Sequence, residues 1–295
     1  MSAIEKPRGA SGPAPQRRRV TELVAACSIE VSPRDELAGE RLCDVLPPGR
    51  TVFVNHPGSV THHDIIAACA RLRRAGFETV PHIAVRRLAS FTQASDFLQR
   101  AVGEAQVTAA LIIGGDPDYP VGPFPDSVDF LASGLIERYG LREVAFAGYP
   151  EGHPGIAARA LDETLRAKVA SARRRGLEVS LVTQFGFDAA PILRWIEALR
   201  AQHVICSVRV GIAGPATVAT LAKFAVRCGI GGSLRALARG HTAFARILAE
   251  AGPDALVDAL VDGEDRDFPI DGLHVFTFGG VRRTAAWIRS TTTAQ

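Results

Sequence analysis

The chain lacks several features that would assign it to a structural class at once. Aromatic residues make up only 6% of its 295 positions, and Ala and Val carry much of the apolar content. No apolar run approaches the ~20 residues of a membrane-spanning helix, so we expect no membrane partner. The five cysteines are odd in number and form no C-x-x-C pair. They are therefore interpreted as reduced core thiols of a cytoplasmic protein, not as a disulfide or zinc framework.

Charge of one sign and the common catalytic motifs are also missing. The 34 basic and 31 acidic residues give a net charge of +3, which is too balanced to indicate a nucleic-acid partner. The chain contains no H-E-x-x-H, P-loop or nucleophile elbow. Metalloprotease, P-loop NTPase and α/β-hydrolase functions have no support, and no metal site is predicted.

The length of the chain fits two ordinary domains or one large α/β barrel. Hydrophobic residues make up 47% and charged residues 22%, as expected of a globular protein with a sizeable core. Residues 1–19 are rich in Pro, Gly, Ala and Arg and lack the apolar segment of a secretory signal. We predict a disordered basic tail over 1–19 and a catalytic domain over 20–295. Since the chain ends soon after the last predicted strand, no C-terminal regulatory domain is expected.

A repeated unit is the most informative pattern present. Short, nearly continuous apolar runs recur, most of them followed by an amphipathic segment, as in parallel strands covered on both faces. Eight such units predict a (β/α)8 barrel. A doubly wound open sheet is the alternative, but no G-x-G-x-x-G follows the first run. Extra helices are expected within 229–270, before the last strand. The eight runs are 26–31, 51–55, 79–85, 109–115, 143–148, 179–185, 205–212 and 273–278.

Polar side chains gather at one end of these runs. In a (β/α)8 barrel the chemistry lies at the C-terminal ends of the strands, so this gathering predicts a common site. The side chains are those of Glu30, Asn55 and His56, His82, Asp116, Tyr149 and His153, Gln184 and Asp188, Arg209 and Arg282.

Three of these residues are candidates on their own chemistry. Glu30 lies in an apolar strand, where partial burial would raise its pKa and suit it to general acid catalysis; a structural salt bridge is the alternative. Asp116 follows two glycines that let the backbone approach a ligand, although it could simply cap the turn. Gln184 offers a donor and acceptors for a heterocycle edge, or could bond a neighbouring strand.

Other polar residues are expected to be structural. Thr61 with Asp64 predicts a capping box, which makes His62 and His63 residues of a helix start. Asp188 is expected to be the N-cap of the helix after the sixth strand. A lone His82 within a strand is more often a core histidine than a ligand.

The strand ends, taken in order, resemble a known family. The segments are "SIEVSP", "PHIAV", "GGDPD", "AGYPEGHP", "TQFGFD", "VGIAGP" and "HVFTF". Over roughly residues 24 to 290 this set is similar to 5,10-methylenetetrahydrofolate reductase. The resemblance implies a (β/α)8 barrel that moves a hydride from NADH or NADPH, through bound FAD, to 5,10-methylenetetrahydrofolate. The product is 5-methyltetrahydrofolate.

The resemblance also implies roles for individual residues. Glu30 would be the acid that assists opening of the folate's five-membered ring, and Asp116 would lie between the pterin and the flavin. Gln184, Phe224 and Arg282 would bind substrate, with Arg282 (or its neighbour Arg283) meeting the glutamyl tail. Residues implied as flavin neighbours are His82, Asp116, Tyr149, His153, Asp162 and Lys168.

The chain departs from the family pattern at several cofactor positions. Gly114 stands where the family has Arg, and Asp126 and Ser127 stand near the place of a Tyr-Ala pair. Leu165 replaces an Asn, and glycines follow the eighth strand where the family has Asn-Arg. A flavin-free reductase with direct hydride transfer therefore stays open beside the FAD enzyme.

Other functions also remain open at this point. A folate-binding methyltransferase subunit without redox activity would need the same folate pocket. The sequence does not fix the direction of the reaction, which could run oxidatively in methyl-group catabolism. NADH against NADPH is equally open, and so is a homo-oligomer.

Overall fold

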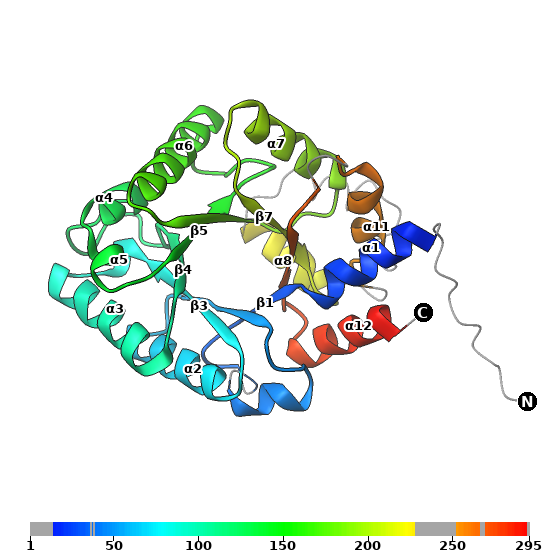
Figure 1. Cartoon of the computed structure of the whole chain (residues 1–295), viewed down its shortest axis with the longest axis horizontal. Coiled ribbons are helices and arrows are strands. Elements are labelled where there is room, and N and C mark those ends of the chain that lie inside the picture. The colour runs from blue at the N-terminus through cyan, green and yellow to red at the C-terminus, as the bar shows by residue number, and fades with distance from the viewer. Residues whose placement is uncertain (1–13, 36, 38, 228–251, 266–268, 294–295) are drawn as a thin grey trace, which may run out of the picture.

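The computed structural model describes residues 14–35, 37, 39–227, 252–265 and 269–293. Eight parallel strands close into one barrel in the order β1 to β8, so the chain has the expected (β/α)8 fold. Helices surround the barrel (Figure 1). Among the described residues no helix is long and apolar enough to cross a membrane.

The strands coincide with the eight predicted runs to within a few residues. The apolar runs are continuous because outward residues pack under helices while inward residues fill the barrel. In β1, for example, Ile29 and Val31 belong to the outer core. The barrel interior is filled by Phe53, Val80, Leu111, Ala145 and Val182. The strands are β1 Ser28–Val31, β2 Thr51–Val54, β3 Glu78–Ala84, β4 Ala109–Ile113, β5 Glu143–Gly148, β6 Glu178–Thr183, β7 Ser207–Ala213 and β8 Gly272–Phe276.

Two helices begin where the sequence predicts their N-caps. The Thr61 side chain accepts from the Asp64 backbone, and Asp64 in turn accepts from the Thr61 backbone, which confirms the capping box. The Asp188 side chain caps α7 by accepting from Ala190. The helices are α1 Ala14–Ala25, α2 His62–Arg74, α3 Phe91–Ala105, α4 Ser127–Ala132, α5 Leu135–Arg138, α6 Ala158–Arg174, α7 Ala189–Ala201, α8 Val218–Arg227, α11 Asp254–Gly263 and α12 Val281–Thr293.

The helix after β7 does not simply join the outer ring. Leu221, Phe224 and Ala225 of α8 pack with aromatic residues at the C-terminal ends of β6 and β8, so α8 lies over that end of the barrel. In Figure 1 it overlaps the barrel, while α11 lies in the ring between α7 and α1. One extra helix predicted within 229–270 is thus present as α11. Residues 228–251 and 266–268 of this connection lie outside the described residues.

The predicted tail ends earlier than expected. Residues 14–19 form the first turns of α1, not disordered chain. They are held because Leu23 and Val24 of this helix are buried and Arg19 binds Glu264, beyond the end of α11. Residues 1–13 lie outside the described residues.

The cysteines follow the prediction only in part. The four described cysteines are free, and Cys27 and Cys69 are buried as expected. Cys43, however, is exposed, with its thiol against the backbone oxygen of Ala75. It lies on the short 3-10 helix η1 (Glu40–Asp44), outside the strands that form the core.

Candidate active site

Glu30 lies inside the barrel near the C-terminal end of β1. Its side chain is only 13% exposed, because strands from both sides cover it. Asn55, just after β2, donates its amide to Glu30 Oε1 at 3.0 Å. His82 of β3 and His274 of β8 both approach the other oxygen, with their Nε2 atoms 3.4 Å and 3.6 Å from Oε2. Four strands thus converge on one carboxylate.

The two histidines are buried, and their environment is partly aromatic. His274 is fully buried and His82 is 7% exposed. The ring of Phe53 meets the His274 ring edge-on at 4.7 Å, and Phe276 meets it at 4.8 Å. Behind His274, its Nδ1 lies 3.0 Å from Ser28 Oγ on β1. The His274 imidazole is therefore fixed on both sides.

The pKa of Glu30 differs from the value expected for a partly buried strand carboxyl. Burial acts to raise it, as predicted, but the charge interaction with His82, the polar contact with His274 and the hydrogen bond from Asn55 oppose burial. The net effect is a pKa below the ordinary value, which corrects the predicted rise. Burial in turn lowers the pKa of His82, with Glu30 opposing. In the ligand-free protein we therefore expect an ionised Glu30 beside a neutral His82 at neutral pH.

A second polar group lies on the loops after β2, β3 and β4. Arg87 donates to the backbone oxygen of Gly58 at 3.2 Å and lies 3.5 Å from the Asp116 carboxylate, which is 59% exposed. His56 packs edge-on against His62 at 4.9 Å. Burial, together with His62 and Arg87, lowers the pKa of His56 to about 4. Asp116 is therefore an exposed residue of the rim, in an ion pair.

The turn after β5 holds Tyr149 and His153 side by side. Their rings meet edge-on at 5.3 Å, and His153 Nδ1 accepts from the Gly155 backbone at 3.1 Å. Gln184 binds this turn, since its Nε2 donates to the backbone oxygen of Gly152 at 3.2 Å. The donor of Gln184 thus makes the structural bond to the neighbouring strand end that the sequence left open.

Two further predicted flavin neighbours lie on α6. Asp162 is exposed, and Lys168 places its ammonium 5.9 Å from the centre of the Phe146 ring. Burial lowers the pKa of Lys168, while the carboxylate of Asp126 opposes this shift. Asp126 itself caps α4 by accepting from Val128 and Asp129.

Aromatic rings form one side of the C-terminal face. Phe224 of α8 stacks on Phe278 at 4.0 Å with 15° between the planes, and Phe278 lies parallel to Phe276 at 5.5 Å. Phe185 meets Phe278 edge-on. Arg282 lies in the first turn of α12 at the same end of the barrel and is exposed.

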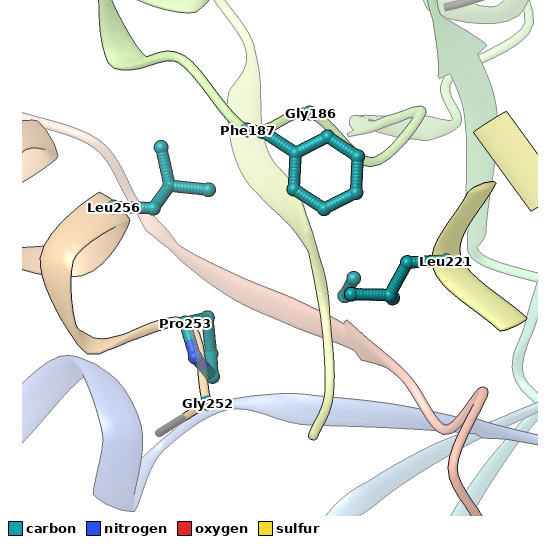
Figure 2. Close-up of a pocket in the computed structure, with 7 residues that line it drawn as sticks. Gly186, Phe187, Leu221, Gly252, Pro253 and Leu256 are labelled. Atoms are coloured by element: carbon teal, nitrogen blue, oxygen red, sulfur yellow. The ribbon is translucent and has the colours of Figure 1, made fainter. Parts of the chain in front are cut away.

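A small apolar pocket lies beside this cluster. Phe187, after β6, and Leu221 of α8 face Pro253 and Leu256, near and within α11 (Figure 2). The pocket carries no charged side chain among its lining residues. It is distinct from the Glu30 group, which lies inside the barrel.

Sequence reasoning missed two parts of this arrangement. His274 was passed over because it lies within the apolar run of β8; its position two residues before the strand end was the available signal. Arg86 fills space beside Gly114, where a Cβ would lie 3.8 Å from its Nε, and it binds the backbone oxygen of Pro125 at 2.8 Å.

Arg209, expected at a strand end, pairs with Gly272 at the start of β8 and therefore lies nearer the opposite end of the barrel.

No three His, Cys, Asp or Glu side chains of the described ranges are placed to hold a metal ion.

No family model matches the chain. The structure is similar to that of an uncharacterised protein from Clostridium thermocellum that binds two copies of 5-methyl-5,6,7,8-tetrahydrofolic acid. The TM-score is 0.58 with 10% identity, over 95% of this chain and 99% of that one. A dihydropteroate synthase from Thermus thermophilus aligns with a TM-score of 0.47 and 15% identity, over 91% and 93% of the two chains. At 10% identity the first likeness establishes a shared (β/α)8 fold alone.

Proposed function

We propose that the protein interconverts 5,10-methylenetetrahydrofolate and 5-methyltetrahydrofolate, with NADH or NADPH as the hydride donor. The observation that carries the proposal is the buried Glu30 carboxylate, contacted by Asn55, His82 and His274 at the catalytic end of the barrel. The ordered strand-end motifs support it. So does the Clostridium thermocellum barrel, which binds the methylated folate.

Glu30 supplies the proton chemistry of this reaction. In the reductive direction the bond between the methylene carbon and one of its two nitrogens breaks, and Glu30 gives that nitrogen a proton. A hydride then reaches the methylene carbon, which becomes the methyl group. In the oxidative direction the ionised Glu30 takes the proton back as the ring closes. One carboxyl thus serves both directions by changing its protonation state.

The other predicted residues would hold the substrates. Phe224, stacked on Phe278, offers a flat apolar face to a pterin or nicotinamide ring. The side-chain oxygen of Gln184 can accept from the heterocycle while its nitrogen keeps the bond to Gly152. Arg282, exposed on the rim, would meet the glutamyl carboxylates.

The residues of this site fit FAD only in part. Tyr149 and His153 lie together at the end of β5 and suit a ring system there. The part of the site that would bind the FAD phosphates is less suitable for them. Lys168 is the cation that would bind a phosphate there, and the Asp126 carboxylate already acts on it electrostatically. This observation favours the flavin-free reductase as the second candidate, in which the nicotinamide passes its hydride directly to the folate.

One experiment tests the proposal and separates the candidates. The purified protein is examined for flavin absorbance and assayed for turnover in both directions with each nicotinamide cofactor. Glu30→Gln should lower folate turnover ~100-fold or more, as for loss of a general acid. The control is Glu197→Gln, which makes the same change on the exposed face of α7 and should leave turnover unchanged.

The outcomes separate the alternatives. A yellow protein with turnover supports the FAD enzyme, and a colourless one with turnover supports direct transfer. Normal turnover in Glu30→Gln would reject Glu30 as the acid. An inactive wild-type protein that binds methyltetrahydrofolate by calorimetry would replace the reductase with the methyltransferase-subunit reading.

A further inference from the structure

Behind Glu30 lies a chain of polar groups that runs from β8 back to β1. Glu30 Oε2 faces His274 Nε2 at 3.6 Å, and His274 Nδ1 lies 3.0 Å from Ser28 Oγ. Ser28 Oγ also lies 3.3 Å from the backbone oxygen of Leu273. Ser28 and His274 are both fully buried. The polar groups therefore follow one another in space in the order Glu30 carboxyl, His274 imidazole, Ser28 hydroxyl and Leu273 backbone carbonyl.

The hydroxyl has a single proton, so it can donate to only one of its two neighbours. If Ser28 donates to His274 Nδ1, the neutral imidazole carries its proton on Nε2 and can donate it to an ionised Glu30. If Ser28 donates to Leu273, it accepts from His274 Nδ1–H instead. The Nε2 lone pair then faces Glu30 and can accept from a protonated carboxyl.

We propose that Ser28 and His274 are positioning residues that form a reversible hydrogen-bond relay, which pairs Glu30 in both of its protonation states. The proposal rests on the proposed function, in which Glu30 gains and loses one proton in each turnover. During the switch the hydroxyl rotates and the imidazole exchanges tautomer. No atom is lost, and the proton that Glu30 gives to substrate is replaced from solvent.

The surroundings favour this relay over free reorientation of the carboxyl. Asn55 donates to Oε1, which fixes which oxygen faces the histidines. The titratable groups that face Oε2 are His82 from β3 and His274 from β8, while His82 in turn acts on His56, which lies just after β2. Next to His274, β7 contributes Gly211 and β2 contributes the ring of Phe53. In the described structure the Nε2 atoms of His82 and His274 are buried and make no hydrogen bond. Either atom can therefore accept a hydrogen bond from a protonated Oε2.

The relay can be tested without substrate, by ¹⁵N NMR of the histidine rings in the ligand-free protein. Glu30→Gln imitates the protonated carboxyl, because its oxygen takes the Asn55 donor and its amide nitrogen then faces the histidines. In the wild type the neutral form of His274, facing the ionised Glu30, should be the Nε2–H tautomer, and it should change to Nδ1–H in Glu30→Gln. The Ser28→Ala, Glu30→Gln double variant should not make that change. An unchanged His274, or a change at His82 alone, would overturn the proposal.

The second test of the relay measures turnover in Ser28 variants. Ser28→Ala should lower kcat about 10-fold, less than the loss of Glu30 itself, with little change in the KM for the nicotinamide. Ser28→Thr keeps the hydroxyl and should recover most of kcat. The control is Ser180→Ala, which also removes a buried hydroxyl from a barrel strand, but one that binds Glu143 at 2.6 Å. If both alanine variants lose kcat equally, the Ser28 effect is structural and the relay is rejected. If the wild type lacks turnover, the proposed function fails while the NMR result still decides the relay.

Discussion

Glu30 shows how a residue acquires its chemistry from distant parts of the chain. Its neighbours in sequence are apolar, and they alone predict a raised pKa. Asn55, His82 and His274 reverse that direction, because they lie after β2, on β3 and on β8, and the closed barrel brings all three to the same carboxylate. The chemistry of this residue is therefore decided by the order and register of the strands.

The burial of His56 should make the stability of the protein depend on pH. Its pKa in the folded protein is about 4, against an ordinary 6.5, because it is buried beside His62 and Arg87. The unfolded chain therefore binds a proton on His56 between these two values when the folded protein does not. The free energy of unfolding should fall as the pH drops from 6.5 to 4. The total loss from this group should be about 3 kcal/mol.

The measurement is urea unfolding at several pH values. His56→Asn should remove about one proton from the difference between the unfolded and folded states over this range. His63→Asn, a change of the same kind at an exposed residue of α2, should leave the pH dependence as it is. A wild-type stability that is flat between pH 6.5 and 4 would contradict the lowered pKa.

At the scale of elements, the end of β5 is determined by a helix further along the chain. A Cβ at Gly148 would lie 2.4 Å from the ring of Trp195 on α7. Glycine is therefore required where the strand passes into the Tyr149 turn. The sequence shows the break in the apolar run, but its physical cause is the packing of α7 against the strand.

Gly148→Ala should consequently be destabilising by about 1–3 kcal/mol, as for overpacking of a close contact. Trp195→Phe shortens the ring that causes the clash, so the double variant should recover part of the loss. Thermal or urea unfolding of the four proteins gives this coupling. Gly103→Ala is the control, since a Cβ there meets nothing within 4 Å and α3 should gain up to ~1 kcal/mol. Additive effects of Gly148→Ala and Trp195→Phe would contradict the proposed clash.

The elements themselves were largely predictable. Eight apolar runs and the caps at Thr61 and Asp188 place the strands and several helices, because both signals are local. The site was predictable in part: the positions of Glu30 and His82 follow from the strand ends, whereas their mutual contact does not. His274 was not assigned a role, because it lies within an apolar run, where a core histidine would also lie.

On the scale of the whole molecule, the ring of helices is closed by the two ends of the described chain. Helix α1 packs against both α11 and α12, which come from the other end (Figure 1). Arg19 joins them with two bonds to Glu264, at 2.8 and 3.1 Å, and one to the backbone oxygen of Ile270 at 2.7 Å. Residues 14–19, which composition assigns to a tail, are thus part of the barrel's outer layer.

Arg19→Gln should destabilise the fold by about 1–3 kcal/mol, because Glu264 is only 10% exposed and would keep a poorly compensated charge. Arg18→Gln is the matched control. Its ion pair with Glu22 is exposed on both sides, so its loss should change stability little. Equal unfolding midpoints for wild type and Arg19→Gln would show that the α1 contact does not stabilise the barrel.

The sequence by itself determined the eight-stranded (β/α)8 fold, the caps at Thr61 and Asp188 and the end of the barrel that carries the polar groups. These follow from periodicity and local capping, which act over a few residues. The tertiary structure decided the ionisation of Glu30, the pairing of His274 with Ser28, and the place of α1 in the outer layer. The reason is that closing the barrel joins β8 to β1, and no local signal records which side chains meet across that seam.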